Sequence, residues 1–189
     1  GTSYSCGSAV VASGESFNVS TENDCAVSPG FEGSAVVSAD QPIAAIVNVN
    51  NKGTGNAAGQ YKGTDGANVA TTIVFPLMKS DFNGRTSTFY VQNASSSSND
   101  LTATFKLRAS DGGATFSQTY DDVPANAMVI ITPADASVTT GTVGSLTVTG
   151  TSELAGTVLE HESAAAVAEN LQASRAFTPS DYDSTLYCP

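Results

Sequence analysis

Basic residues are scarce in this chain of 189 residues: 7 lysines and arginines stand against 18 aspartates and glutamates, for a formal net charge of −11. No cluster of basic residues occurs anywhere along the sequence. A protein that binds nucleic acid, or an anionic membrane surface, uses such clusters to neutralise phosphates. The composition therefore argues against nucleic acid and against membrane lipid as partners.

Long apolar runs are also missing. No stretch approaches the roughly 18 consecutive apolar residues of a membrane-spanning helix, so we expect no membrane insertion. The chain opens G-T-S-Y-S-C, which lacks the basic and apolar regions of a signal peptide. If the protein is exported, its signal has been removed or the sequence begins inside a longer chain.

Residues that carry chemistry are few. The sole histidine, His161, lies between Glu160 and Glu162 at the end of an expected strand, where neighbouring side chains alternate across the sheet. We therefore expect an exposed histidine and no His–Glu base. The sequence has no G-x-S-x-G motif, no calcium-loop pattern and no close Cys/His spacing. It predicts no catalytic residue, no bound metal, no cofactor and no enzymatic activity.

Charged residues make up 13% of the chain, and Ser, Thr, Gly, Ala and Asn take their place. A polar surface of hydroxyl and amide groups is common in secreted and cell-surface proteins. Hydrophobic residues make up 40%, which is enough to build a core. The composition predicts a folded protein in an extracellular or cell-surface location.

Three cysteines, Cys6, Cys25 and Cys188, leave one sulfur over if two of them pair. We expect a disulfide between Cys6 and Cys25, which would close a loop of about 20 residues and contribute about 3 kcal/mol. The alternative is two free buried thiols. Cys188 is then the spare cysteine, and we expect it to bond to another chain or to a part of the protein outside this sequence.

Two triplets match the N-glycosylation pattern: N-V-S at Asn18 and N-A-S at Asn93. Such triplets arise often by chance in a chain rich in Ser and Thr. Both asparagines are candidate glycosylation sites.

The clearest structural pattern is alternation of apolar and polar residues. Within residues 101–108, Leu101, Ala103, Phe105 and Leu107 alternate with polar side chains, which is typical of a half-buried strand. Short strands separated by turn sequences predict an antiparallel β-sandwich or barrel. One segment differs: residues 163–177 are rich in helix formers and predict a short helical insert. Further strands are expected at residues 16–20, 34–38, 43–50, 71–75, 76–78, 86–92, 114–120, 127–132, 145–149 and 154–160.

The sequence also contains an internal repeat. Residues 33–47 (G-S-A-V-V-S-A-D-Q-P-I-A-A-I-V) align without gaps with residues 144–158 (G-S-L-T-V-T-G-T-S-E-L-A-G-T-V). The repeat predicts a partial β-sandwich module over residues 1–75 and a complete module over residues 76–189, about the size of an immunoglobulin-type domain. The alternative is one larger β-sandwich or jelly roll in which the repeat is internal pseudo-symmetry.

Three motifs carry a resemblance to a known family: F-P-L-M-K from Phe75, N-G-R-T-S-T-F-Y-V-Q-N from Asn83, and P-I-A-A-I-V from Pro42 after a Gly-Ser-opened strand. Together they resemble the repeated immunoglobulin-like β-sandwich modules of large secreted bacterial surface and filament proteins. The resemblance implies stalks, spacers, adhesin segments or filament subunits, and it brings no catalytic residue.

These patterns lead to two functional hypotheses. The first is a secreted, non-enzymatic building block of a filament, stalk or surface layer, which self-associates through strand edges into a homopolymer. The second is a module that binds glycans or surfaces. A sugar site usually needs an aromatic platform, and the chain has no Trp; Tyr61, Tyr120 and Tyr182 are the tyrosines expected at the surface.

Overall fold

The computed structural model describes residues 2–50, 58–162 and 171–185. All strand pairs in this part of the chain are antiparallel, so the all-β prediction is confirmed. Contacts divide the chain into two compact units, Gly1–Ala35 and Val36–Pro189. The module boundary expected after residue 75 falls inside a strand of the second unit.

The described residues of the first unit contain one short helix, α1 (Thr21–Asp24), and no strand. Ser20 precedes the helix and its Oγ accepts a hydrogen bond from the N–H of Asn23. The predicted disulfide between Cys6 and Cys25 is present. The strands predicted at residues 16–20 and 34–38 are not formed, because neither segment has a partner strand to pair its backbone groups.

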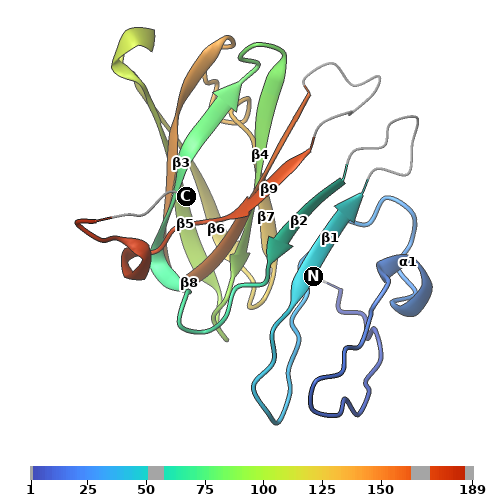
Figure 1. Cartoon of the computed structure of the whole chain (residues 1–189). Coiled ribbons are helices and arrows are strands. Elements are labelled where there is room, and N and C mark those ends of the chain that lie inside the picture. The colour runs from blue at the N-terminus through green and yellow to red at the C-terminus, as the bar shows by residue number, and fades with distance from the viewer. Residues whose placement is uncertain (1, 51–57, 163–170, 186–189) are drawn as a thin grey trace. The chain divides into compact units, whose positions relative to one another are not determined.

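The second unit contains a two-stranded hairpin and a larger seven-stranded sheet (Figure 1). The hairpin joins β1 (Ile46–Asn50) to β2 (Ala58–Lys62). The strands of the larger sheet are β3 (Ala70–Ser80), β4 (Arg85–Asn93), β5 (Asn99–Leu107), β6 (Thr115–Val123), β7 (Met128–Ile131), β8 (Thr142–Glu162) and β9 (Gln172–Arg175). Two 3₁₀ turns, η1 (Ala109–Asp111) and η2 (Pro179–Asp181), complete the elements.

Strand β8 belongs to two layers. Its first half pairs with β5 on one side and β3 on the other, whereas its second half pairs with β4 and β9. The result is two layers that share one strand: β6-β5-β8-β3 and β7-β4-β8-β9. The sequence predicted two separate strands at residues 145–149 and 154–160, and they are one continuous strand instead.

The crossing point of β8 is fixed by a buried asparagine, Asn99, at the start of β5. Its Oδ1 accepts hydrogen bonds from the N–H of Ser152 at 3.0 Å and from the hydroxyl of Thr151 at 2.9 Å. Its Nδ2 donates to the carbonyl of Ser152 at 3.1 Å. A Cβ at Gly150 would lie 2.9 Å from Asn99 Oδ1 and from Ser152 O, so a glycine is required where the strand turns.

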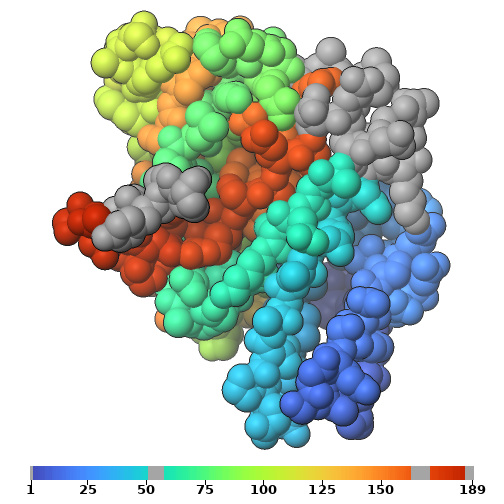
Figure 2. Space-filling model, in the orientation of Figure 1, coloured from blue at the N-terminus to red at the C-terminus, as the bar shows by residue number. Residues whose placement is uncertain are grey.

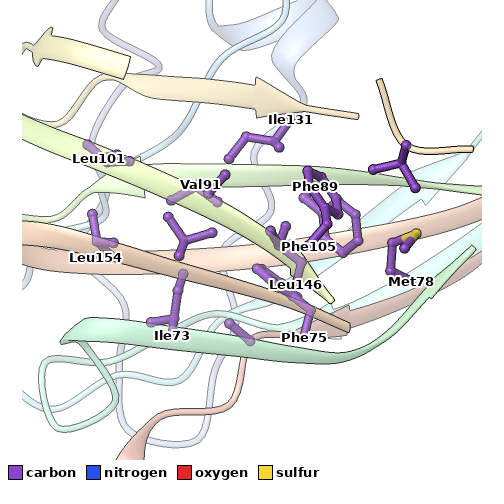
Figure 3. Packing of buried hydrophobic residues seen from close by; sticks show 14 of the residues in the cluster. Ile73, Phe75, Met78, Phe89, Val91, Leu101, Phe105, Ile131, Leu146 and Leu154 are labelled. Carbon is purple, nitrogen blue, oxygen red and sulfur yellow. The ribbon is translucent and has the colours of Figure 1, made fainter. Parts of the chain in front are cut away.

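The core lies between the two layers. Phe89 of β4 packs between Phe75 of β3 and Phe105 of β5, with ring centroids 4.9 Å and 6.2 Å away. Figure 3 shows these rings with aliphatic side chains from β3, β4, β5 and β8 pointing toward one another. The remaining large buried side chains in the core are Ile73, Met78, Val91, Leu101, Ile131, Leu146, Val148 and Leu154.

The helix predicted over residues 163–177 is wrong for its described part. Residues 163–170 lie outside the described residues, and Gln172–Arg175 form β9, which pairs with β8. The intrinsic helix preference of Ala, Ser and Arg is overridden by the ladder with β8. Strand β2 was not predicted, because A-G-Q-Y-K has no clear apolar alternation.

Replacing Asn99 with alanine should lower the free energy of unfolding by about 3 kcal/mol, because it removes a buried amide and leaves the partly buried backbone of Ser152 without these partners. Urea denaturation measures the change. Asn18→Ala, at an exposed site in the first unit, is the matched control and should change stability by less than about 0.5 kcal/mol. Equal effects of the two substitutions would contradict the structural role given to Asn99.

Candidate functional site: an open sheet edge

Strand β6 forms an open edge of the first layer. It pairs with β5 on one side, and no backbone hydrogen bond joins residues 115–120 to any other described segment. The carbonyl of Ala114 accepts from the N–H of Leu107 of β5. Hydrogen-bonding groups alternate in direction along a strand, so Thr115, Ser117 and Thr119 direct theirs away from the sheet.

No side chain of this edge is of a kind that blocks pairing with another strand. Natural edges are commonly protected by lysine, proline or an early bulge. Residues 115–120 read T-F-S-Q-T-Y and contain none of these. A bulge follows only at Asp121 and Asp122, where the register with β5 shifts and Asp122 adopts φ 53°. The open stretch is therefore about six residues long and polar on its outer face.

The edge formed by β3 is closed instead. The N–H of Val74 donates to the carbonyl of Phe177, and the N–H of Phe177 donates back to the carbonyl of Val74, each at 2.8 Å. Further along β3, Pro76 has no N–H to offer. In the second layer, Ala173 of β9 packs against Gly59 of β2, and β9 runs beside β2 across the face seen in Figure 2.

Beside β9 lies a small hollow of about 180 Å³. Its walls combine apolar side chains such as Leu77 and Val158 with Gln172 and Arg175. Phe177 stands at its rim with 42% of its surface exposed. The hollow is mostly apolar, and its remaining polar lining is formed by Ser87, Glu160 and Ser174.

The ionic groups near this hollow are used to hold strands together. Glu160 of β8 is only 7% exposed, and its Oε1 lies 2.8 Å from the Nζ of Lys79 and 2.7 Å from the Nε of Arg85. One carboxylate thus joins β3, β4 and β8. Since two cations share its Oε1, we assign it a structural role.

A second ion pair fixes the turn after β9. Arg175 forms a two-pronged salt bridge with Asp181, whose carboxylate also accepts from the N–H and hydroxyl of Thr178. The hydrogen bonds from Arg175 hold the pKa of Asp181 far below its ordinary value, and those from Thr178 act in the same direction. The pair anchors η2 next to the hollow.

The sequence predicted an exposed His161, and the structure differs. It is half-buried, and its Nε2 lies 3.0 Å from Thr88 Oγ1 on the neighbouring strand. The second ring nitrogen, Nδ1, lies 3.0 Å from the carbonyl of Glu162. These contacts use both ring nitrogens within the sheet, so the ring has no nitrogen directed at a substrate.

The two candidate glycosylation sites differ in solvent exposure. Asn18 is exposed, so glycosylation there stays a prediction. Asn93 is 0% exposed, and its Nδ2, the atom that would carry a glycan, donates to the carbonyls of Ser97, Val123 and Pro124. The folded domain has no room for a sugar at Asn93, which corrects the sequence-based expectation. Nothing in the triplet N-A-S distinguishes a buried asparagine from an exposed one.

The remaining predicted residues are distributed as follows. Cys188 lies outside the described residues. Tyr61 is half-buried, and burial raises its pKa. Tyr120 packs against the core, whereas Tyr182 is exposed. These tyrosines do not combine into a flat aromatic platform, because they lie on different elements and two of them face inward.

Groups of three or more metal-ligating side chains are absent from the described parts of the chain. In the same residues no helix is long and apolar enough to cross a membrane. Comparison of the chain with protein-family models, with curated proteins and with solved structures found no match. Among the described strands that pair on one side only, β6 is longer than β1 and β7.

Glu160→Gln should lower the free energy of unfolding by about 2 kcal/mol, because Lys79 and Arg85 lose their shared carboxylate in a largely buried position. Chemical denaturation at pH 7 provides the measurement. Glu153→Gln, at an exposed position on the same strand, should leave stability within about 0.5 kcal/mol of the parent. A Glu160 variant as stable as the parent would show that the cluster contributes no net stability.

The Asp181 carboxylate should make stability depend on pH. Its pKa is lowered in the folded state, so its contribution is complete above about pH 5 and is lost as the pH falls below about 4. Asp181→Asn should cost about 1 kcal/mol at pH 7, after allowance for solvent screening, and much less at pH 2. Thermal melts of both proteins across this range test it; a difference independent of pH would contradict the assignment.

Proposed function

We propose that this chain is a secreted, non-enzymatic structural protein, a β-sandwich building block of an extracellular filament, stalk or surface layer. Its activity is association with further copies of itself through strand edges. The immunoglobulin-like character of its modules belongs to the same proposal. The observation that carries it is the open edge of β6, a six-residue stretch in which Thr115, Ser117 and Thr119 direct backbone groups away from the sheet and which contains no proline, lysine or bulge.

A second feature supports growth beyond a pair of subunits. A contact that repeats the same surface on two copies closes on itself, so a polymer needs a second, different contact. The N-terminal segment supplies a candidate surface for it, because its large apolar side chains are exposed. They are Val10, Val11, Phe17, Val19 and Phe31 of the first unit. Covering such side chains with another copy would remove apolar surface from water.

The extracellular location rests on the disulfide and on the composition. The bond between Cys6 and Cys25 is of a kind that persists in oxidising compartments. The low share of charged residues, 13%, agrees with a surface of hydroxyl and amide groups. An interchain bond through Cys188 belongs to the same proposal, since an odd cysteine in such a compartment is available for another chain.

Binding of glycans is the second candidate function. The observation in its favour is the hollow beside β9, where the exposed ring of Phe177 adjoins the polar side chains of Gln172 and Arg175. An exposed ring beside hydrogen-bonding groups is the usual composition of a sugar site. The hollow is small and its lining is mainly apolar, so assembly remains the first proposal.

Thr119→Pro tests assembly at the edge. The N–H of Thr119 points away from β5, so proline removes a donor from the open edge while leaving the ladder with β5 intact. Light scattering coupled to size exclusion should show oligomers of the 19.1 kDa parent chain and a shift to monomer in the variant. Electron microscopy should show ordered polymers of the parent protein.

Two controls accompany this test. Thr119→Lys, which adds a charge to the same edge without changing the backbone, should also favour the monomer. Thermal melts establish that each variant is folded. A parent chain that stays monomeric at every concentration and binds a glycan array would overturn the structural proposal in favour of the second candidate.

A further inference from the structure

We propose that the partner of the open edge is the β6 strand of a second copy of this chain, paired antiparallel about a two-fold axis through Gln118. This inference rests on the proposed self-association and specifies its interface. In this register Ser117 lies opposite Thr119 of the partner subunit, and each Gln118 lies opposite its own equivalent. The two β6 strands would join the first layers of two molecules into one continuous sheet.

The direction of the backbone groups fits this register. Ser117 and Thr119 both point their N–H and C=O groups away from β5. This follows because the carbonyl of Ala114 accepts from Leu107 of β5, and backbone groups alternate in direction along a strand. Residues that face one another with outward groups can exchange two hydrogen bonds. In the structure, Gln118 Nε2 already donates to the carbonyl of Thr119 at 3.2 Å. A side chain thus occupies the acceptor that the N–H of a neighbouring strand would use.

Side-chain matching selects the register among its neighbours. Phe116 and Tyr120 lie on the inner face of β6 and are partly buried against the core. Centring the pair on Gln118 places each Phe116 opposite a Tyr120 of the partner subunit, and aromatic cross-strand pairs stabilise antiparallel sheets. Centring it on Ser117 instead places Phe116 opposite Gln118, and centring it on Thr119 places Phe116 opposite Asp122. Of these three registers, the one centred on Gln118 is the one that pairs the aromatic rings.

Charge complementarity supports the same choice. Lys106 of β5 is exposed and reaches over β6, where its Nζ donates to Thr115 Oγ1 at 3.1 Å and to the carbonyl of Gly113 at 2.6 Å. In the proposed register Asp121 lies opposite Thr115 of the partner subunit. Its carboxylate therefore meets the ammonium group of Lys106 from the other copy. Asp121 has no ion pair within the described residues, and the two-fold axis creates this contact twice.

The bulge after Tyr120 sets the length of the interface. Asp121 and Asp122 together face a single residue of β5, and Asp122 adopts a left-handed backbone conformation. This arrangement ends the regular strand, so the paired stretch runs from Thr115 to Asp121 on each copy. A pairing of about seven residues is a usual strand length in globular proteins.

A cysteine scan reads the register directly. Gln118→Cys, made with Cys188→Ser to remove the spare thiol, places two cysteines opposite one another in a non-hydrogen-bonded pair, where the Cα atoms are about 4.5 Å apart and a disulfide can form. Under mild oxidation this variant should form a covalent dimer on a non-reducing gel. Ser117→Cys and Thr119→Cys in the same background are offset from their own equivalents and should cross-link poorly.

Charge reversal provides an independent test. Asp121→Lys should weaken dimerisation about tenfold, because two attractive contacts become repulsive. Adding Lys106→Glu to the same chain should restore it, since the opposite charges face each other again. Rescue by the double variant distinguishes a contact between copies from a general loss of stability, which thermal melts of each variant also monitor.

The outcomes separate this interface from the broader proposal. Cross-linking at position 118 together with charge-reversal rescue supports the β6 pair. Oligomers that persist in all β6 variants, with no preference for position 118, overturn this interface while leaving self-association intact. Preferred cross-linking at position 117 or 119 overturns the register. A parent chain that is monomeric throughout overturns both proposals.

Discussion

The hydrogen bonds that join the Asn99 side chain to the backbone of Ser152 and to the hydroxyl of Thr151 determine how the two layers of the sandwich are connected. At this point β8 leaves one layer and enters the other, and without Asn99 the partly buried backbone of Ser152 would lack these partners. Asn93 lies beside Asn99 and binds the carbonyls of the loop that leads from β6 to β7. Two buried amides therefore set the geometry of β4, β5 and β8 together.

Sharing β8 has consequences for the edges of both layers. The chain after β9 also changes layers, since Ala176 bonds to Gly156 of β8 and Phe177 bonds to Val74 of β3. The side of the sandwich near β3 and β9 is closed by this crossing. On the opposite side β6 has no such cover among the described residues, so the asymmetry of the fold leaves β6 as a long open edge.

Two groups of charged side chains in the second unit are committed to the fold. Glu160 ties three strands through Lys79 and Arg85, and Asp181 anchors the turn after β9 through Arg175. Burying or pairing these groups leaves a surface dominated by hydroxyl and amide side chains.

The alternating pattern of the sequence correctly predicted an all-β protein, the location of β4 to β7 and the disulfide between Cys6 and Cys25, because each depends on local periodicity or on a short spacing. The pattern could not show that residues 145–149 and 154–160 form one strand, since the continuity depends on Asn99, about 50 residues away in the chain. It could not show that Asn93 is buried, or that residues 16–20 lack a partner. Edge strands and inner strands have the same alternation of apolar and polar residues. Whether β6 has a neighbouring strand on both sides therefore depends on how the other strands are arranged, which only the tertiary structure determines.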